Sequence, residues 1–216
     1  MSRPAALVHE RWRAVAGLEH GFLAGRVEPE TSVLCPRQVH GTRVVTAEPD
    51  AERPEADGLV TSSRATRVGV VTADCVPVLL FAPDRRVVAA VHAGWRGAAA
   101  GIVDEALAHL RRAFGVEPGE VEAALGPAIG ACCYEVGPEV RDAFVRRSGE
   151  TTATAWRPVG DRLMLDLRGA VECLLRRAGV REVATIGPCT RCAPEYCSYR
   201  RDGAGCGRQL SFIGWA

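Results

Sequence analysis

The sequence of 216 residues contains no lysine and no asparagine. Without lysine the chain cannot form a Schiff base, and it lacks the lysine of a phosphate-binding P-loop. Without asparagine a Cys-His-Asn protease triad cannot be assembled. No apolar run approaches the roughly 20 residues of a membrane span, and residues 1–10 lack the apolar core of a signal peptide. These absences predict a cytoplasmic protein with no membrane partner.

An excess of charge of either sign is also missing. The 27 basic and 26 acidic residues give a formal net charge of +1, which argues against a nucleic-acid partner. The chain is 47% hydrophobic and 25% charged, which is typical of a globular protein, and its length fits one domain over residues 1–216. The nine cysteines are odd in number and irregularly spaced, so we expect reduced thiols rather than a disulfide framework.

Short β-branched runs and three periodic segments indicate the secondary structure. Strands are predicted at 32–34, 43–46, 58–61, 68–72, 77–81, 86–91, 121–125 and 182–186. Helices are predicted at 97–114, 138–147 and 166–178, and loops at 48–56, 117–120 and 193–207. Pro77 is expected to interrupt its strand. Because the first strands follow one another without helices, we predict an α+β fold of layered mixed sheets with flanking helices.

Three residues with ligand chemistry stand at the ends of predicted strands. His40 lies in Gln-Val-His-Gly, Cys75 in Thr-Ala-Asp-Cys, and His92 directly after the run 87–91. Two imidazoles and one thiolate suit Zn²⁺ and leave a fourth position open for water or substrate. A metal-free dyad, with Cys75 as nucleophile and His92 as base, explains the same residues. A third interpretation treats them as unrelated core or turn residues, and spacing alone does not decide.

Longer strings add a family resemblance. QVHGTRVV, ADGLVTS, VGVVTADCVPVLLFAP, VAAVHAGWRGAAAGIV, ALGPAIGACCYEVGPEV and SYRRDGAGCGRQLSFI resemble successive motifs of the YfiH/laccase-domain family, from about His20 to Trp215. The resemblance implies a layered α+β fold and one zinc ion held by His40, Cys75 and His92. It also implies phosphorolysis of adenosine, inosine, guanosine and methylthioadenosine, and deamination of adenosine, with purine nucleosides and phosphate as small-molecule partners.

The same resemblance suggests roles for other residues of these motifs. Asp74, beside Cys75, is the candidate that would pass a proton to the leaving ammonia during deamination, or it caps a turn. Arginine forks bind phosphate oxygens bidentately. The candidates for this contact are Arg96, Arg200 and Arg201, with Arg37 a weaker one. Tyr199 is expected to contact the ribose or the base, or to pack in the interior.

Two features depart from the family pattern. His20-Gly21-Phe22 is followed by only 15 residues before Gln38, so the N-terminal segment that would help to wall the pocket is shortened. Four cysteines near the C-terminus could form a second, structural zinc site, although packed reduced thiols explain them as well. These cysteines are Cys189, Cys192, Cys197 and Cys206, while the adjacent Cys132 and Cys133 are expected to be structural.

Three other functions remain as alternatives. A copper-dependent polyphenol oxidase would need about ten histidines, and the chain has five, so copper is disfavoured as the cofactor. A hydrolase that uses Cys75 as its nucleophile could act on amide bonds. A non-catalytic descendant that binds nucleosides without turnover would account for the shortened N-terminal segment. The sequence makes no prediction of the oligomeric state.

Overall fold

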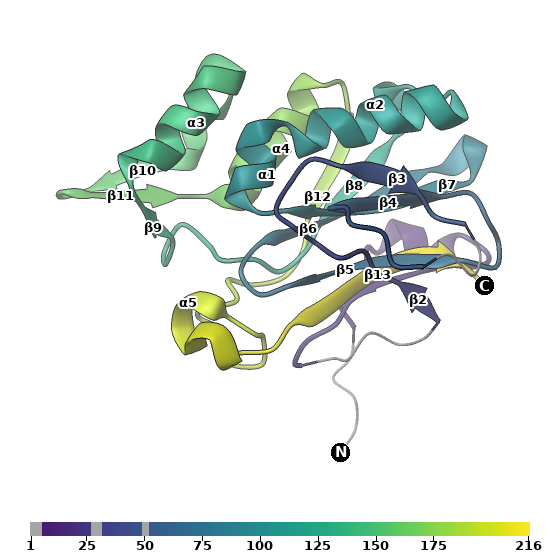
Figure 1. Ribbon diagram of the computed structural model, residues 1–216, viewed down its shortest axis with the longest axis horizontal. Coiled ribbons are helices and arrows are strands. Elements are labelled where there is room, and N and C mark those ends of the chain that lie inside the picture. The colour runs from purple at the N-terminus through teal and green to yellow at the C-terminus, as the bar shows by residue number, and fades with distance from the viewer. Residues whose placement is uncertain (1–5, 27–31, 49–51) are drawn as a thin grey trace.

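The computed structural model describes residues 6–26, 32–48 and 52–216 of the chain. Its strands form three sheets, two of which mix parallel and antiparallel pairs. The two larger sheets are stacked, and helices cover the outer face of one of them (Figure 1). The predicted α+β fold of layered mixed sheets with flanking helices is therefore confirmed.

The six-stranded sheet is the centre of the fold, with the strand order β12-β8-β6-β7-β4-β3. Its outer pairs β3·β4 and β8·β12 are parallel and its inner pairs antiparallel. Leu79 of β6 is opposite Ala90 of β7 and Ala124 of β8. In chain order the strands are β3 (Val44–Thr46), β4 (Gly58–Thr61), β6 (Val76–Ala82), β7 (Val87–Ala93), β8 (Glu122–Leu125) and β12 (Glu182–Thr185).

The two smaller sheets flank this centre. The four-stranded sheet has the order β1-β13-β5-β2, so β13 lies between strands from the first half of the chain. The three-stranded sheet, β10-β11-β9, extends to one side below α3 (Figure 1). The bounds are β1 (Leu18–Phe22), β2 (Val33–Leu34), β5 (Arg67–Thr72), β9 (Glu135–Val136), β10 (Trp156–Val159), β11 (Arg162–Leu165) and β13 (Gln209–Trp215).

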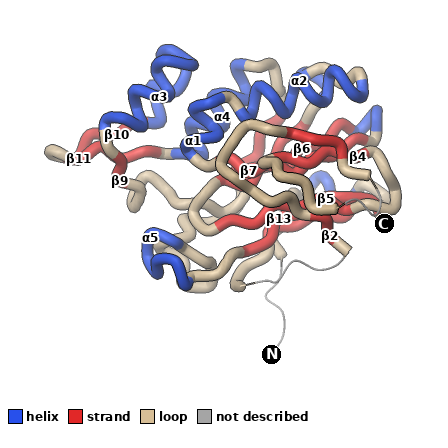
Figure 2. The backbone as a smooth tube through the Cα atoms, viewed as in Figure 1, coloured by secondary structure: helices blue, strands red, loops and turns tan. Residues whose placement is uncertain are grey.

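The helices pack on the face of the six-stranded sheet that is turned away from β13 (Figure 2). They are α1 (Trp95–Ala100), α2 (Ile102–Phe114), α3 (Pro138–Ser148) and α4 (Leu167–Arg177). The short α5 (Tyr199–Asp202) lies apart from them, on the side of β13 (Figure 1). Short 3₁₀ turns occur at Arg11–Ala14, Pro83–Arg85, Pro118–Glu120, Gly149–Ala155 and Gly203–Gly205. Asp166 caps α4 as predicted, because its Oδ1 accepts the Gly169 N–H at 3.0 Å.

The hydrophobic core has two layers, one on each face of the six-stranded sheet. Val78 and Leu80 of β6 face the helices, whereas Leu79 and Phe81 face the four-stranded sheet. Every residue of β6 and β7 is buried. Burial on both faces explains why these strands are continuous apolar runs rather than alternating ones.

Every predicted strand is present, but several local predictions were wrong. The single helix at 97–114 is two helices, because Gly101 adopts a left-handed conformation with φ +104° and separates α1 from α2. The expected loop at 193–207 contains α5 and a 3₁₀ turn. The sequence also gives no strand for β1, β9, β10, β11 or β13. β9, β10 and β11 are short, and β1 and β13 pair with partners that are distant in the chain.

Pro77 does not interrupt its strand, contrary to prediction. It lies within β6, opposite His92, and its carbonyl accepts the Gly126 N–H at 2.9 Å on the β8 side. The N and O of one residue point the same way in an antiparallel strand. The proline nitrogen therefore faces the side where β8 has ended at Leu125. The missing N–H breaks no ladder hydrogen bond with β7.

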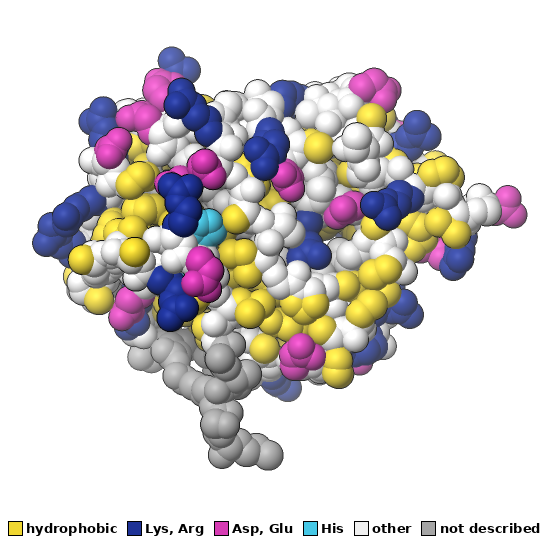
Figure 3. Space-filling model, turned by 180° about the vertical axis from the view of Figure 1, so that it is seen from behind, with side chains coloured by type: hydrophobic (Ala, Val, Ile, Leu, Met, Phe, Trp, Pro, Cys, Tyr) yellow, Lys and Arg dark blue, Asp and Glu magenta, His cyan; other side chains and the backbone are white. Residues whose placement is uncertain are grey.

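The surface carries charges of both signs. In the view from behind, acidic and basic side chains are interspersed over the face, with apolar side chains between them (Figure 3). This distribution agrees with the formal net charge of +1. In the described part of the chain, no helix combines the length and the apolarity that crossing a bilayer would require.

We predict that Leu79→Ala destabilises the protein by about 2–5 kcal/mol, because Leu79 is fully buried between two sheets and its loss leaves a cavity. Urea unfolding measures the change. Val159→Ala is the control, since Val159 is 47% exposed and should change the stability by less than about 0.5 kcal/mol. Similar losses for the two variants would contradict the layered core.

Candidate metal centre

The structure brings together His40, Cys75 and His92, the three predicted ligands. Their donor atoms all lie within 4.8 Å of one another. Cys75 Sγ is 3.9 Å from His40 Nε2, and the two imidazole rings are 4.8 Å apart at 84°. Cys75 precedes β6 and His92 lies near the end of β7, so the pairing of these two strands sets their separation.

The backbone beside the ligands is in an unusual conformation. His40 has φ +60° and Asp74 has φ +84°, in the left-handed region that residues other than glycine rarely adopt. Each such residue costs of order 1–3 kcal/mol and persists only where the surroundings fix it. The His40 N–H donates to Asp57 at 3.0 Å, and the Asp74 carbonyl accepts the Ile129 N–H at 2.9 Å. Both flanks of the centre are therefore held in place by hydrogen bonds.

One buried carboxylate positions both histidines. Asp57 is fully buried and accepts the backbone N–H groups of Val39 at 3.3 Å, His40 at 3.0 Å and Gly41 at 2.7 Å. It also accepts His92 Nδ1–H at 2.8 Å. This bond fixes the tautomer of His92 and leaves Nε2 free to act as a ligand.

The sequence analysis missed Asp57. The residue stands in the quoted string ADGLVTS, but an aspartate before glycine is typical of a turn. Its partner His92 is 35 residues away. An aspartate directly before a predicted strand was the one signal available.

The protonation of the metal-free centre follows from these contacts. Burial raises the pKa of the Cys75 thiol, but hydrogen bonds from His40 and His92 outweigh it and lower the pKa to about 6. Burial lowers the pKa of His92, but Asp57 and Cys75 outweigh it and raise the pKa to about 9. Cys75 is thus a thiolate at neutral pH, the form that binds metal, and His92 must release a proton when a metal ion binds.

The residues fit a metal ion of borderline softness. Tetrahedral zinc with ordinary Zn–N and Zn–S bonds places nitrogen and sulfur ligands about 3.5 Å apart, close to the distance between His40 and Cys75. The backbone of Gly94 packs directly against two of the three ligands. A Cβ there would lie 3.0 Å from the His40 ring and 3.1 Å from Cys75 Sγ. Three protein donors leave the remaining coordination position to water or substrate.

The three ligands line a pocket of about 540 Å³. Among the described residues that line it, Asp74 is the one acidic side chain. The aromatic side chains are Trp95, Tyr134 and Tyr199, and the arginines are Arg37, Arg53, Arg96, Arg200 and Arg208. Ring faces beside cationic forks suit a flat heterocycle attached to an anionic or hydroxyl-rich group.

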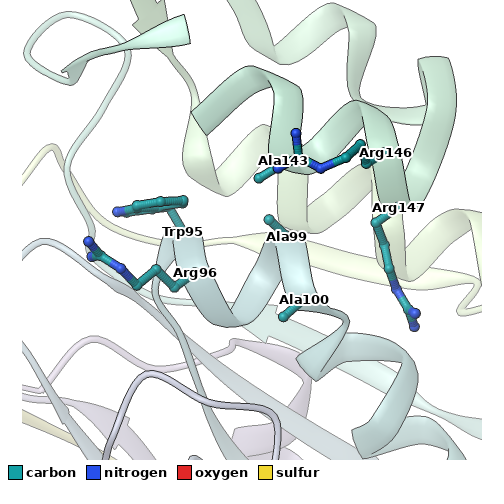
Figure 4. Close-up of a pocket in the computed structure, with 7 residues that line it drawn as sticks. All are labelled: Trp95, Arg96, Ala99, Ala100, Ala143, Arg146 and Arg147. Atoms are coloured by element: carbon teal, nitrogen blue, oxygen red, sulfur yellow. The ribbon is translucent and has the colours of Figure 1, made fainter. Parts of the chain in front are cut away.

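Several predicted site residues lie in this pocket. The Arg96 guanidinium lies over the Trp95 ring at 4.4 Å (Figure 4). That pair also borders a separate pocket of about 430 Å³ between α1 and α3. Arg200 lies over the Tyr134 ring at 5.0 Å and donates to the Glu135 carbonyl at 2.9 Å.

Tyr199 and Arg37 also line the pocket. Tyr199 is 56% exposed, so the alternative that it packs in the interior is wrong. Arg37 forms an ion pair with Glu55 at the rim.

Arg201 and Asp74 are tied to the surrounding backbone. Arg201 donates to the carbonyls of Thr190 at 3.0 Å and Tyr196 at 2.7 Å, and it pairs with Asp202. It is not among the residues that line the pocket, so its contacts hold the 190–196 loop. Asp74 Oδ1 accepts the Thr190 hydroxyl at 2.6 Å and Oδ2 accepts the Arg200 N–H at 2.7 Å. The capping interpretation of Asp74 therefore has a concrete basis.

The remaining lining residues were missed. Arg53 and Arg208 come from segments that the sequence places in loops or leaves unassigned, and each donates to a nearby backbone carbonyl. Trp95 and Tyr134 stand inside quoted motifs but carried no assigned role. The sequence does not show whether an aromatic side chain at the start of a helix or in a turn faces a pocket or the core.

The expected cluster of C-terminal cysteines needs correction. Cys189 and Cys192 group with Cys132 and Cys133, not with Cys197 and Cys206. Cys197 is buried, and the Cys206 thiol donates to the Gly207 carbonyl at 3.3 Å. Pairing of β8 with β12 brings the loops that follow these strands together, which sequence spacing does not reveal.

Comparisons with known proteins give a consistent result. Residues 8–216 match the family described as multi-copper polyphenol oxidoreductase laccase. A purine nucleoside phosphorylase of Clostridium acetobutylicum is 36% identical over 179 residues, covering 82% of this chain and 74% of that protein. The purine nucleoside phosphorylase YfiH of Shigella flexneri is 40% identical over 195 residues, covering 89% and 76%. The crystal structure of the hypothetical protein YfiH of Bacillus licheniformis superposes with a TM-score of 0.86 at 26% identity, covering 99% and 97%.

We predict that Asp57→Asn lowers the affinity for a divalent metal about 10- to 100-fold. Each carboxylate oxygen accepts two hydrogen bonds, and the amide replaces one oxygen by an NH₂ group, so two donors lose their acceptor. Competition with a chelator measures the affinity. Asp161→Asn, the same change at an exposed turn, is the control. Equal affinities in the two variants would show that the buried carboxylate does not support the ligands.

Proposed function

We propose that this chain, which belongs to the multi-copper polyphenol oxidoreductase laccase family, is a zinc-dependent purine nucleoside phosphorylase. The proposed substrates are adenosine, inosine, guanosine and methylthioadenosine together with inorganic phosphate, and adenosine is also deaminated to inosine. In phosphorolysis a phosphate oxygen bonds to C1′ of the sugar as the C1′–N9 bond breaks, and the bonding pair leaves with the purine. The products are the free base and the sugar 1-phosphate.

A single observation carries this proposal. The three metal-ligand candidates open into a pocket that combines aromatic rings with five arginines. A purine nucleoside offers a flat ring for stacking and a polar sugar, and phosphate offers oxygens for guanidinium forks. The similarity to purine nucleoside phosphorylases supports the same assignment.

The arginines have distinct surroundings that suggest a division of labour. Arg37 is paired with Glu55, and Arg53 donates to the carbonyls of Cys35 and Pro36. Arg96 and Arg200 lie over aromatic rings. Arg200 gives one N–H to the Glu135 carbonyl, and its other guanidinium nitrogens, like those of Arg96, point to the ring edge where an anion could bind. We assign phosphate binding to Arg96 and Arg200, and contacts with the base or sugar to Tyr134 and Tyr199.

The ligands and their neighbours have separate roles. A zinc ion bound by His40, Cys75 and His92 would supply a Lewis acid and an acidic water site. Asp57 orients His40 and His92 and keeps the negative charge of its carboxylate in a buried position. Catalytic contacts are assigned to Cys75 and His92 through the metal, and to Asp74 as a candidate proton donor in deamination. Asp74 lines the pocket while its two oxygens are held by Thr190 and Arg200.

The positions of the other histidines do not favour a multi-copper centre. The His9 backbone N–H donates to His20 Nε2 at 2.9 Å beside Trp12, and His109 bonds to Thr46 at 2.9 Å. None of these three belongs to a described group of metal-binding side chains. A trinuclear copper cluster requires many more converging imidazoles than His40 and His92 supply.

One observation favours a second candidate function. In the metal-free chain the lowered pKa of Cys75 and the raised pKa of His92 describe a thiolate beside an imidazolium, the arrangement of a cysteine nucleophile. A thiol-dependent amidase is therefore the alternative. In that case, alkylation of Cys75 in metal-free protein would abolish an amide hydrolysis that zinc does not restore.

The first prediction concerns products and the metal ligand. Protein loaded with zinc should convert inosine and phosphate to hypoxanthine and ribose 1-phosphate. Chromatography of the reaction mixture measures the formation of both products. Cys75→Ser should lower this rate by at least about 100-fold, because losing a ligand costs more than losing an outer partner. Cys173→Ser is the matched control, since its thiol contacts Thr154 outside the site.

The outcome that would contradict the proposal is specific. Zinc-loaded protein that releases neither free base nor inosine from adenosine would not be the proposed enzyme. A calorimetric titration with inosine then separates two cases. Measurable binding without turnover identifies a non-catalytic descendant, and absence of binding rejects the pocket assignment as well.

The second prediction concerns phosphate. Arg96→Gln should raise the KM for phosphate about 10- to 100-fold, because a charge-assisted hydrogen bond contributes about 1.5–3 kcal/mol. Steady-state rates at varied phosphate measure the change. The control is Arg146→Gln on α3, which borders only the neighbouring pocket (Figure 4). An unchanged KM in Arg96→Gln would move phosphate binding to another arginine.

A further inference from the structure

Four thiols form a second cluster outside the pocket. Cys132 and Cys133 lie in the turn that leads from β8 to β9, and Cys189 and Cys192 lie in the loop after β12. We call Cys132, Cys133, Cys189 and Cys192 the thiol cluster. Their sulfur atoms all lie within 4.8 Å of one another. Cys132 and Cys192 are exposed, and the other two are half-buried.

The sulfur–sulfur distances match a tetrahedral metal site. Cys133 Sγ is 3.4 Å and Cys132 Sγ is 3.7 Å from Cys192 Sγ. With Zn–S bonds of about 2.3 Å, the edge of a tetrahedron of sulfurs is about 3.8 Å. A disulfide instead requires about 2.05 Å, and all four cysteines are free.

The backbone around the cluster has the features of a built site. The Gly130 N–H donates to Cys189 Sγ at 3.2 Å, which favours the thiolate form. A Cβ at Gly130 would lie 3.4 Å from Cys132 Sγ and 3.3 Å from the Cys189 Cβ, so the glycine packs directly against the cluster. Cys189 and Cys192 have the C-x₂-C spacing of structural zinc sites. The N–H groups of Cys192 and Ala193 bond back to the Cys189 carbonyl at 3.1 and 3.0 Å, which closes the turn.

We propose that the thiol cluster binds one divalent zinc ion in a closed, structural tetrathiolate site that is separate from the site of His40, Cys75 and His92. Four thiolates around one divalent ion carry a net charge of −2. The nearby Cys133 raises the pKa of the Arg191 guanidinium, and the positive charge of Arg191 partly offsets the negative charge of the site. No coordination position is left for a substrate, because all four ligands come from the protein.

The position of the cluster gives it a mechanical role. Thr190, between the cysteines of the C-x₂-C turn, donates its N–H to the Ala128 carbonyl and its hydroxyl to Asp74. Tyr134, which lines the pocket, directly follows Cys133. A metal ion in the thiol cluster would therefore fasten together the two loops that position Asp74 and Tyr134.

Zinc counting on the purified full-length chain tests this proposal. Elemental analysis should find two zinc ions per wild-type chain and one in Cys192→Ser. Cys206→Ser is the matched control and should retain two, because Cys206 lies outside the cluster. Cys75→Ser should also retain one, but from the thiol cluster. The zinc content therefore tests the two proposed sites separately. If the wild-type chain holds a single zinc ion that is lost in Cys192→Ser and kept in Cys75→Ser, the thiol cluster is supported and the zinc-dependent pocket is rejected.

Cobalt loading provides a readout that does not depend on how the variants fold. Wild-type protein titrated with Co²⁺ should show thiolate-to-cobalt charge-transfer absorption from two classes of site. The class with four sulfur ligands should be about four times as intense per ion as the class with one. Native mass spectrometry of the wild-type chain should show two zinc ions that are lost on denaturation.

Three results would overturn the proposal. The first is an equal zinc content in wild type and Cys192→Ser. The second is a cobalt spectrum of the intensity expected for a single thiolate. The third is peptide mapping under non-reducing conditions that finds a disulfide between Cys192 and either Cys132 or Cys133.

Discussion

The carboxylate of Asp57 is the interaction on which the metal centre depends. It lies at the start of β4 and bonds to the bend that carries His40 and to His92 on β7. Burying an ionised carboxylate is costly unless it is paired and hydrogen-bonded. Here four donors satisfy it. The register of β4 against β7 and the geometry of the centre are therefore coupled, since a slip of one residue would separate Asp57 from its donors.

The rest of the site is assembled from segments that the stacked sheets bring to one place. The turn between β5 and β6 supplies Asp74 and Cys75, and therefore joins the four-stranded sheet to the six-stranded one. The start of α1 contributes Trp95 and Arg96, and α5 contributes Tyr199 and Arg200. The turn and α1 adjoin buried strands directly, and α5 is held by the bond from the Arg200 N–H to Asp74. Rigid strands beneath polar loops are the arrangement in which sites usually form.

The sequence predicted those parts of the molecule in which local pattern and tertiary structure agree. Apolar runs bracket Cys75, precede His92 and lie near His40, so all three candidates were visible, and the family resemblance favoured the metal interpretation over the alternatives. Asp57 was invisible because its role arises from a partner 35 residues away. The thiol cluster was assigned wrongly for the same reason. The Cys133–Cys192 contact spans 59 residues, whereas Cys197 and Cys206 are near in sequence but lie outside the cluster. Pro77 and Gly101 show the opposite case. Proline does break ladder hydrogen bonds, but the sequence does not show that the nitrogen of Pro77 faces a side without a partner strand. Glycine does end helices, but the sequence does not show that a second helix begins directly after Gly101.

The central place of β13 in the four-stranded sheet has a consequence for how the protein is made. This strand holds β1 and β5 together, yet every other strand is synthesised before it. While the ribosome is translating the chain, β1 and β5 therefore present unpaired edges and the apolar side chains that β13 will later cover. Co-translational folding can complete the six-stranded sheet and its helices first. The four-stranded sheet is completed only when residues 209–215 have left the exit tunnel. A nascent chain stalled shortly before that point would be a natural target for chaperones.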